Sequence, residues 1–272
     1  MVMAEPIQPG SFDARGQHGP FDIIGDVHGC ADELEQLLDR LGYRVCFQGS
    51  GADPEVVVSS PAGRRAVFVG DLVDRGPRSV DALRLVMAMV ARGQALCLPG
   101  NHDEKLLRWL GGRAITVSGG LAQTVRQLEH ESLAFRDRVR SFLASLPDYL
   151  WLDGGRLVVS HAGLKAEMIG RTSHAIRSFC LYGDTTGERD AFGLPVRRDW
   201  AADYRGEIAV LYGHTPVEAA VWCNNTLCLD TGCVYGNMLS ALRWPEREIV
   251  QVPAARVYAV RVKPLGRVVA PQ

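Results

Sequence analysis

The fold is decided by the stretch Phe21-Asp22-Ile23-Ile24-Gly25-Asp26-Val27-His28-Gly29, in which a short apolar run passes directly into a polar loop bounded by glycines. Two later stretches repeat this form. Ala66 to Val69 runs into Gly70-Asp71-Leu72-Val73-Asp74-Arg75-Gly76, and Ala95 to Leu98 leads to Gly100-Asn101-His102-Asp103. A short apolar run between turn residues is typical of a buried strand. We therefore predict strands over 21–24, 66–69 and 95–98, each followed by a cluster of polar side chains.

Helices are predicted between these strands. Leucines recur at helical spacing over 31–41, and Gly42 ends that helix. A second helix is predicted over 79–92, with Ser79 as its cap and Gly93 after its end. Because strands and helices alternate, we expect an α/β fold with at least a partly parallel sheet.

The remainder of the chain is assigned more coarsely. We predict irregular strands over 43–60, mostly helix over 103–146, and strands over 157–159, 209–211, 227–229 and 257–262. Residues 1–20 lack hydrophobic periodicity and are expected to form a flexible tail. The expected organisation is therefore a tail over 1–20, one domain over 21–265 and a short C-terminal tail over 266–272.

The composition narrows the range of partners. The chain has 272 residues and a formal net charge of −1, so no basic excess indicates a long nucleic-acid track. No apolar run approaches the roughly 20 residues needed to cross a bilayer, and no secretory signal is recognised. The seven cysteines form no C-x-x-C pair. We expect a cytoplasmic protein with reduced, mostly buried thiols and no membrane partner.

Two further loops complete a candidate site. Val158-Val159-Ser160 runs into His161, and Val210-Leu211-Tyr212 runs into Gly213-His214. A single loop of this kind is most often an ordinary turn, but five of them at strand ends should converge on one site. The donors are carboxylate, imidazole and amide oxygen, from Asp26, His28, Asp71, Asn101, His161 and His214. Six donors exceed what one ion with an open position needs, so we expect two divalent metal ions that share a carboxylate.

These motifs, in this order, resemble the calcineurin-like metallophosphoesterase superfamily. Within it, residues 21–265 look most similar to the phosphatase domain of bacterial polynucleotide kinase–phosphatase. The narrower resemblance depends on segments 162–165, 181–187, 200–204 and 229–233. The resemblance implies a four-layer α/β/β/α sandwich, with two mixed sheets flanked by helices and the metal site at the carboxyl ends of strands. The chain has no Gly-x-x-x-x-Gly-Lys loop, so any kinase or ligase would be a separate partner.

The resemblance also implies a role for each site residue. One metal would be held by Asp26, His28 and Asp71, and the other by Asp71, Asn101, His161 and His214. Mn²⁺ is the expected metal, with Fe, Zn²⁺ and Ni²⁺ as alternatives. Arg75 would bind the phosphate, and His102, oriented by Asp74, would act as the general acid. Asp230 is expected beside the ligands or the substrate, with an ordinary turn aspartate as the alternative.

Several substrates fit this machinery. The leading prediction is a phosphoesterase for 3′-phosphate or 2′,3′-cyclic phosphate ends of nucleic acids, or for nucleotides, in RNA repair. The alternatives are a symmetrical diadenosine tetraphosphate hydrolase, a Ser/Thr protein phosphatase, and a non-enzymatic metal-binding adaptor in an RNA-repair complex. His102 and Arg75 argue against the adaptor, because a binding module needs no general acid. Specificity is expected from segments 111–130 and 165–205, the second of which mixes arginines with aromatic residues.

Overall fold

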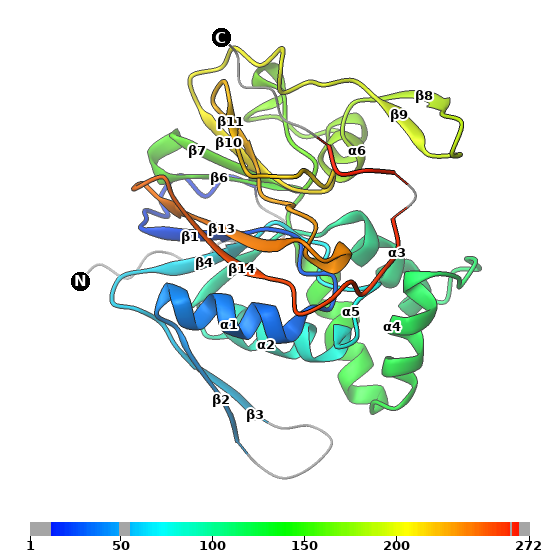
Figure 1. The fold of residues 1–272 in the computed structure, drawn as a ribbon. Helices are drawn as coiled ribbons and strands as arrows, with labels where there is room; N and C mark the ends of the chain where they lie inside the picture. The colour runs from blue at the N-terminus through cyan, green and yellow to red at the C-terminus, as the bar shows by residue number, and fades with distance from the viewer. Residues whose placement is uncertain (1–11, 49–54, 262, 267–272) are drawn as a thin grey trace.

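Two five-stranded sheets form the centre of the molecule (Figure 1). The computed structural model describes residues 12–48, 55–261 and 263–266. The first sheet has the strand order β14 (Glu248–Pro253), β13 (Met238–Trp244), β1 (Phe21–Ile24), β4 (Arg65–Phe68) and β5 (Ala95–Cys97). The second has the order β11 (Trp222–Cys223), β12 (Thr226–Cys228), β10 (Ala209–Tyr212), β7 (Leu157–Ser160) and β6 (Tyr149–Leu152).

Both sheets are mixed. In the first sheet β1, β4 and β5 run parallel, while β13 pairs antiparallel with β1, so that Ile24 lies opposite Ala241. In the second sheet β7, β10 and β12 are parallel, and β6 and β11 are antiparallel edges. Parallel strands place their carboxyl ends on the same edge of a sheet. Both sheets therefore present a set of strand ends that can build a site.

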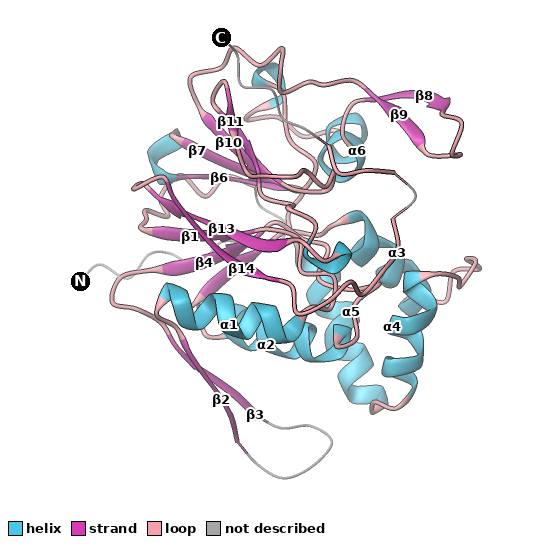
Figure 2. Ribbon diagram, in the orientation of Figure 1, coloured by secondary structure: helices cyan, strands magenta, loops and turns pink. Residues whose placement is uncertain are grey.

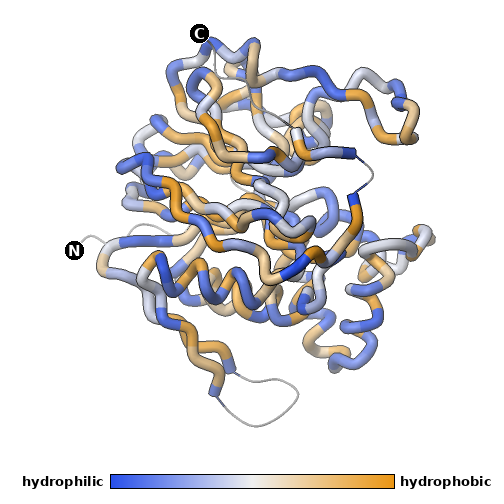
Figure 3. The backbone as a smooth tube through the Cα atoms, viewed as in Figure 1, coloured by the Kyte–Doolittle hydropathy of each residue, from blue (hydrophilic) through white to orange (hydrophobic). Residues whose placement is uncertain are grey.

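The core lies in three layers of side chains. Phe21 and Ile23 of β1 face the second sheet, where they pack with residues such as Leu211, and Ile24 faces the helices on the other side. This alternation follows from the two-residue period of a strand. The other face of the second sheet packs on helix α6 (His174–Tyr182) and on Trp200. Hydrophobic segments accordingly run through the strands of both sheets (Figure 3). The predicted four-layer arrangement is confirmed.

The helices lie on the outer faces (Figure 2). Helix α1 covers the first sheet with its buried leucines and ends at Gly42 in the left-handed conformation, as predicted. Helix α1 spans Ala31–Leu41. The other helices and the short 3₁₀ turns have the following bounds: α2 (Ser79–Ala91), α3 (Asn101–Leu110), α4 (Gly120–Glu129), α5 (Leu133–Ser145), η1 (Asp153–Gly155), η2 (Ala166–Met168) and η3 (Cys233–Tyr235). Two hairpins project from the body, β2 (Arg44–Gln48) with β3 (Glu55–Ser59), and β8 (Thr185–Arg189) with β9 (Pro195–Arg197).

Three local predictions need correction. The segment 257–261 is irregular and not a strand, and residue 262 lies outside the described residues. Ser79 does not cap α2, because its hydroxyl instead accepts a hydrogen bond from the Asp74 amide at 3.1 Å. Residues 12–20, expected in a tail, are packed: the Ala14 amide donates to the Trp151 carbonyl of β6 at 3.0 Å. Residues 1–11 and 267–272 of the expected tails lie outside the described residues.

None of the helices within the described residues combines the length and apolar character that crossing a membrane requires.

Candidate metal centre

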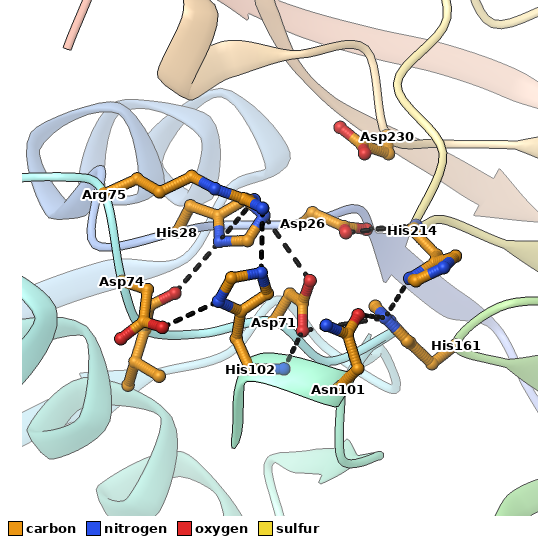
Figure 4. Close-up of polar contacts among 12 residues, drawn as sticks. Asp26, His28, Asp71, Asp74, Arg75, Asn101, His102, His161, His214 and Asp230 are labelled. Carbon is orange, nitrogen blue, oxygen red and sulfur yellow. Dashed lines mark hydrogen bonds and ion pairs between the residues drawn. The ribbon is translucent and has the colours of Figure 1, made fainter. Parts of the chain in front are cut away.

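The site is built by five loops that follow parallel strands. Three come from the first sheet, after β1, β4 and β5, and two come from the second, after β7 and β10. Figure 4 shows that their side chains converge. The structure brings together all of the residues predicted as metal ligands, as phosphate ligand or as general acid, and these are Asp26, His28, Asp71, Asp74, Arg75, Asn101, His102, His161 and His214. The site therefore lies where the edges of the two sheets meet.

Asp71 is the centre of the cluster. Its Oδ2 lies 3.4 Å from Nε2 of His28, and its Oδ1 lies 3.6 Å from Nε2 of His161. Two groups of donor atoms, each spanning less than 4.8 Å, share this residue: one adds His28 and His102, and the other adds His161 and His214. A carboxylate between two groups of imidazoles is the arrangement that a bridging ligand needs.

The second group contains an amide oxygen as well. Nε2 of His161 lies 3.2 Å from Oδ1 of Asn101 and 3.1 Å from Nδ1 of His214. Asp26 lies between His28 and His214 (Figure 4), and the backbone amide of His214 donates to the Asp26 carboxylate at 3.0 Å. The donors predicted for the second metal thus lie within contact distance of one another.

The histidines offer lone pairs to the cluster. Burial lowers the pKa of His28 and of His214 well below the usual range and also lowers the pKa of His161, so these rings are neutral near pH 7. Nδ1 of His28 lies 2.9 Å from the Val73 carbonyl, and Nδ1 of His161 lies 3.1 Å from the Val69 carbonyl. Each carbonyl fixes the proton on Nδ1, and each Nε2 lone pair then points into the cluster.

The buried carboxylates of the site carry negative charge that the surrounding protein does not fully compensate. Burial raises the pKa of Asp26 well above its usual range, and the neighbouring Asp230 and Asp71 raise it further. Asp230 is itself buried, and its Oδ2 has no hydrogen-bond partner among the described residues. Buried carboxylates of this kind repel one another unless cations compensate them. The donor set and its uncompensated charge fit two divalent cations. Asp230 lies above Asp26 and His214 in Figure 4, apart from the groups that share Asp71.

His102 is held separately from the other histidines. Its Nδ1 lies 2.7 Å from Oδ2 of Asp74, and Nη2 of Arg75 lies 2.8 Å from its Nε2. The other oxygen of Asp74 accepts a hydrogen bond at 2.7 Å from Thr124 of α4. These contacts fix the ring of His102 so that its Nε2 and the guanidinium of Arg75 lie side by side at the rim of the cluster.

The backbone of the site is strained. Among the described residues, eight other than glycine have a positive φ, and five of them are site residues: His28, Asp71, Asp74, Arg75 and His214. Such positions cost about 1–3 kcal/mol each and persist only where the surrounding structure imposes them. Glycine permits the close packing of these loops, because a Cβ on Gly213 would lie 1.8 Å from Oδ1 of Asp26.

Sequence reasoning missed several supporting residues. Thr124, which braces Asp74, lies inside the segment 111–130 that was expected to set specificity. Asp103 is fully buried and accepts from the Gly100 amide at 2.9 Å and from the Leu72 amide at 3.1 Å, which ties two ligand loops together. A polar residue three positions into a helix, as Asp103 is, was the available signal for this role.

Only part of segment 165–205 faces the site. Arg197 does so, with its Nη2 2.9 Å from Nε2 of His214. Arg177 instead pairs with Asp148 and Glu104, and Arg205 donates to the backbone carbonyls of Ala202 and Tyr204. Most of the arginines in this segment therefore have structural contacts of their own.

A mixed α/β sandwich with an Asp, His and Asn cluster at the meeting edges of its sheets has the fold and site of a metallophosphoesterase. The chain belongs to the calcineurin-like phosphoesterase family, whose match covers residues 19–218. It is therefore a hydrolase of the metallophosphoesterase class, and its superfamily was predicted correctly.

Its relatives carry a more specific name. The asymmetrical bis(5′-nucleosyl)-tetraphosphatase PrpE of Anoxybacillus flavithermus is 44% identical over 242 residues, which cover 88% of this chain and 96% of the relative. The protein of the same name from Bacillus subtilis is 42% identical, with the same coverage. The predicted closeness to polynucleotide kinase–phosphatase is thus wrong.

Solved structures show the same fold. A candidate diadenosine tetraphosphatase is 24% identical, with a TM-score of 0.64 over 90% of this chain and 98% of its own. A protein Ser/Thr phosphatase from Saccharomyces cerevisiae is 14% identical, with a TM-score of 0.59 over 94% of this chain and 86% of its own.

Proposed function

We propose that this chain is a metal-dependent bis(5′-nucleosyl)-tetraphosphatase that hydrolyses diadenosine tetraphosphate to ATP and AMP. One observation carries this proposal: relatives of that name are 42–44% identical along 94–96% of their own length. The leading prediction from the sequence was a substrate with nucleic-acid ends. The proposed substrate is instead diadenosine tetraphosphate, which the sequence had suggested as an alternative. It departs from that alternative in one respect, because the relatives are named asymmetrical and not symmetrical.

The residues of the site support this reaction. Asp26, His28 and Asp71 would hold one metal ion, and Asp71, Asn101, His161 and His214 would hold the other. When bound, such ions supply an activated water molecule and neutralise phosphate oxygens. Mn²⁺ remains the metal that we would test first.

The chain contributes two groups of its own to the substrate. Arg75 presents two donors beside the cluster, and a guanidinium fork can bind two non-bridging oxygens of one phosphate. His102, oriented by Asp74, is placed to give a proton to the departing oxygen. The oxygen of water forms a bond to the α-phosphorus, the bond from that phosphorus to the bridging oxygen breaks, and ATP leaves with that oxygen.

The test is to identify products. The purified chain, loaded with Mn²⁺, is incubated with diadenosine tetraphosphate, and the nucleotides are separated by chromatography. Equal amounts of ATP and AMP are expected, whereas two molecules of ADP would indicate symmetrical cleavage. A 3′-phosphate oligonucleotide and a phosphopeptide serve as competing substrates. Faster hydrolysis of either of these than of the dinucleotide would refute the proposal.

A further inference from the structure

Two cavities of different character meet at His214. One lies over the metal cluster and has a volume of about 340 Å³. The other lies behind His214 and has a volume of about 220 Å³. Their walls have only two residues in common, Arg197 and His214. A molecule bound at the cluster can therefore extend in two directions, into surroundings that differ.

The cavity over the cluster has a roof made from distant parts of the chain. Leu194, Pro195 and Arg197 come from the β8–β9 hairpin, and Val260, Arg261 and Lys263 come from the segment after β14. The ammonium group of Lys263 pairs with Asp190, which fastens the segment to the hairpin. The roof is therefore held together by an ion pair that does not involve the metal ligands.

This cavity carries excess positive charge. Arg75, Arg197, Arg261 and Lys263 line it, against Asp71 as the one carboxylate in its wall. Lys263 is neutralised by Asp190, but none of the three guanidinium groups lies within 4 Å of a carboxylate oxygen of the described residues. Arg75 and Arg261 both lie over the ring of Tyr235, each with its Cζ 5.6 Å from the ring centroid. Three guanidinium groups around one cavity that form no ion pair at contact distance with the described residues indicate a ligand with several negative charges.

The cavity behind His214 is mainly aromatic and apolar. Trp200 and Tyr212 line it, with ring centroids 5.0 Å apart, together with Ala162 and Val217. Two acidic residues also line it: Asp184 is paired with Lys165 and Arg198, and Asp199 accepts a hydrogen bond at 3.2 Å from the Ala202 amide. A small pocket with aromatic walls and a few polar groups suits a nucleoside rather than a chain of phosphates.

We propose that these cavities bind the two unequal parts of a dinucleoside tetraphosphate. The nucleoside next to the cleaved phosphate lies in the cavity of Trp200 and Tyr212, and the three departing phosphates lie along Arg197 and Arg261 under the roof. This inference rests on the proposed function and explains its asymmetry. With the nucleoside in that cavity, the α-phosphate bonded to it lies at the cluster. Attack on the α-phosphorus then breaks the link between the α and β phosphates.

Adenosine 5′-tetraphosphate tests the assignment of the two cavities, because it has a nucleoside at only one end. If its adenosine occupies the Trp200 cavity, water cleaves between the α and β phosphorus atoms, and the products are AMP and inorganic tripolyphosphate. If its adenosine lies at the other end, the products are ATP and inorganic phosphate. AMP with tripolyphosphate is the expected result, and a majority of ATP with phosphate would overturn the assignment.

A pair of variants tests the cationic cavity. Arg261→Gln removes a cation from the roof, and Arg256→Gln removes an exposed cation of the same segment that does not line the cavity and contacts Tyr258. Binding of the magnesium complex of inorganic tripolyphosphate is measured by calorimetry. Arg261→Gln should weaken it about tenfold, the factor for one lost charge-assisted hydrogen bond. Arg256→Gln should leave it unchanged, and equal affinities for the two variants would overturn the proposal.

Steady-state kinetics provide a second readout. In Arg261→Gln, kcat/KM for diadenosine tetraphosphate should fall about tenfold further than kcat/KM for p-nitrophenyl phosphate, which has a single phosphate. An equal fall for both substrates would show that Arg261 supports the site in general and does not bind the phosphate chain. If the chain does not cleave the dinucleotide at all, the proposed function fails, while the tripolyphosphate titration still decides the role of the roof.

Discussion

Oδ2 of Asp74 lies 2.7 Å from Nδ1 of His102, on the side of the ring that faces away from the rim of the metal cluster. A carboxylate at this position holds the proton on Nδ1 and fixes the plane of the ring. Nε2 is then the atom that meets Arg75 and the substrate. The pair therefore prepares one nitrogen for proton transfer. His28 and His161 turn their Nε2 atoms to Asp71, and His214 turns its Nδ1 to Nε2 of His161, so these three rings are the ones placed to hold metals.

Replacing His102 with alanine should slow the chemical step. General acid catalysis contributes about 10²- to 10⁴-fold, so kcat for phenyl phosphate should fall within that range. The loss should be smaller for p-nitrophenyl phosphate, whose leaving group needs less help from a proton. Both values come from steady-state kinetics with saturating metal. Equal activity of the variant and the unaltered chain on phenyl phosphate would exclude the general-acid role.

Thr124→Val tests whether the orientation of Asp74 matters. The valine keeps the shape of the side chain but removes the hydroxyl that donates to Oδ1 of Asp74 at 2.7 Å. We expect a lower kcat with little change in KM, because the substrate makes no contact with Thr124, and a loss smaller than that of His102→Ala. Because Thr124 is fully buried, the thermal unfolding of the variant should be recorded as well, to separate a loss of stability from a loss of catalysis. A rise in KM at constant kcat would contradict a positioning role.

Asp71→Asn should weaken both metal sites together. Asp71 belongs to both donor groups, and an amide is a poorer ligand than a carboxylate for a hard cation. Metal content after dialysis against Mn²⁺, measured by mass spectrometry, should fall from about two ions per chain to below one, as expected for loss of a shared ligand. The exposed Asp32→Asn should retain the full content. Retention of one tightly bound ion by Asp71→Asn would show that the two sites do not share this residue.

Gly213→Ala should disturb the site through a single methyl group. The added Cβ would lie 1.8 Å from Oδ1 of Asp26. This is far too close for a carbon and an oxygen that are not bonded, so the carboxylate or the loop must move. We expect a loss of metal content and a cost of about 1–3 kcal/mol in the free energy of unfolding, which is typical of overpacking. Gly16→Ala is the matched control, because its Cβ would meet no atom within 4 Å. Equal stability and metal content in the two variants would contradict this view of Gly213.

The elements with the strongest local patterns were predictable. The strand over Phe21–Ile24 and the helix over Ala31–Leu41 were predicted with their observed bounds, because both combine clear periodicity with a terminating glycine. The segment 257–262 was also predicted to be a strand, on its run of mostly apolar residues. In the structure, Val260 is 93% exposed and the segment pairs with no strand over its described residues. Periodicity alone does not show whether a partner strand is available.

The predicted site shows a similar division. Residues that share a short motif with a strand end, such as Asp71 and His161, could be predicted because the strand fixes their position. Arg197 and Arg261 could not be assigned to the cavity, since they lie in a hairpin and an irregular segment whose courses depend on packing. The substrate was misjudged for the same reason. The ligand motifs determine the type of reaction, and the cavity walls that distinguish substrates come from loops without a periodic pattern.

The antiparallel pairing of β1 with β13 has a consequence for synthesis on the ribosome. Strand β1 emerges before its partner Met238–Trp244, which follows more than 200 residues later. At about 5–20 residues per second, β1 waits roughly 10–45 s for that partner. During this time one edge of an apolar strand lacks its final neighbour and could pair with another nascent chain. Among the strand pairs of the described residues, the one of longest range therefore lies beside the loop of Asp26 and His28, so this loop gains its final support only late in translation.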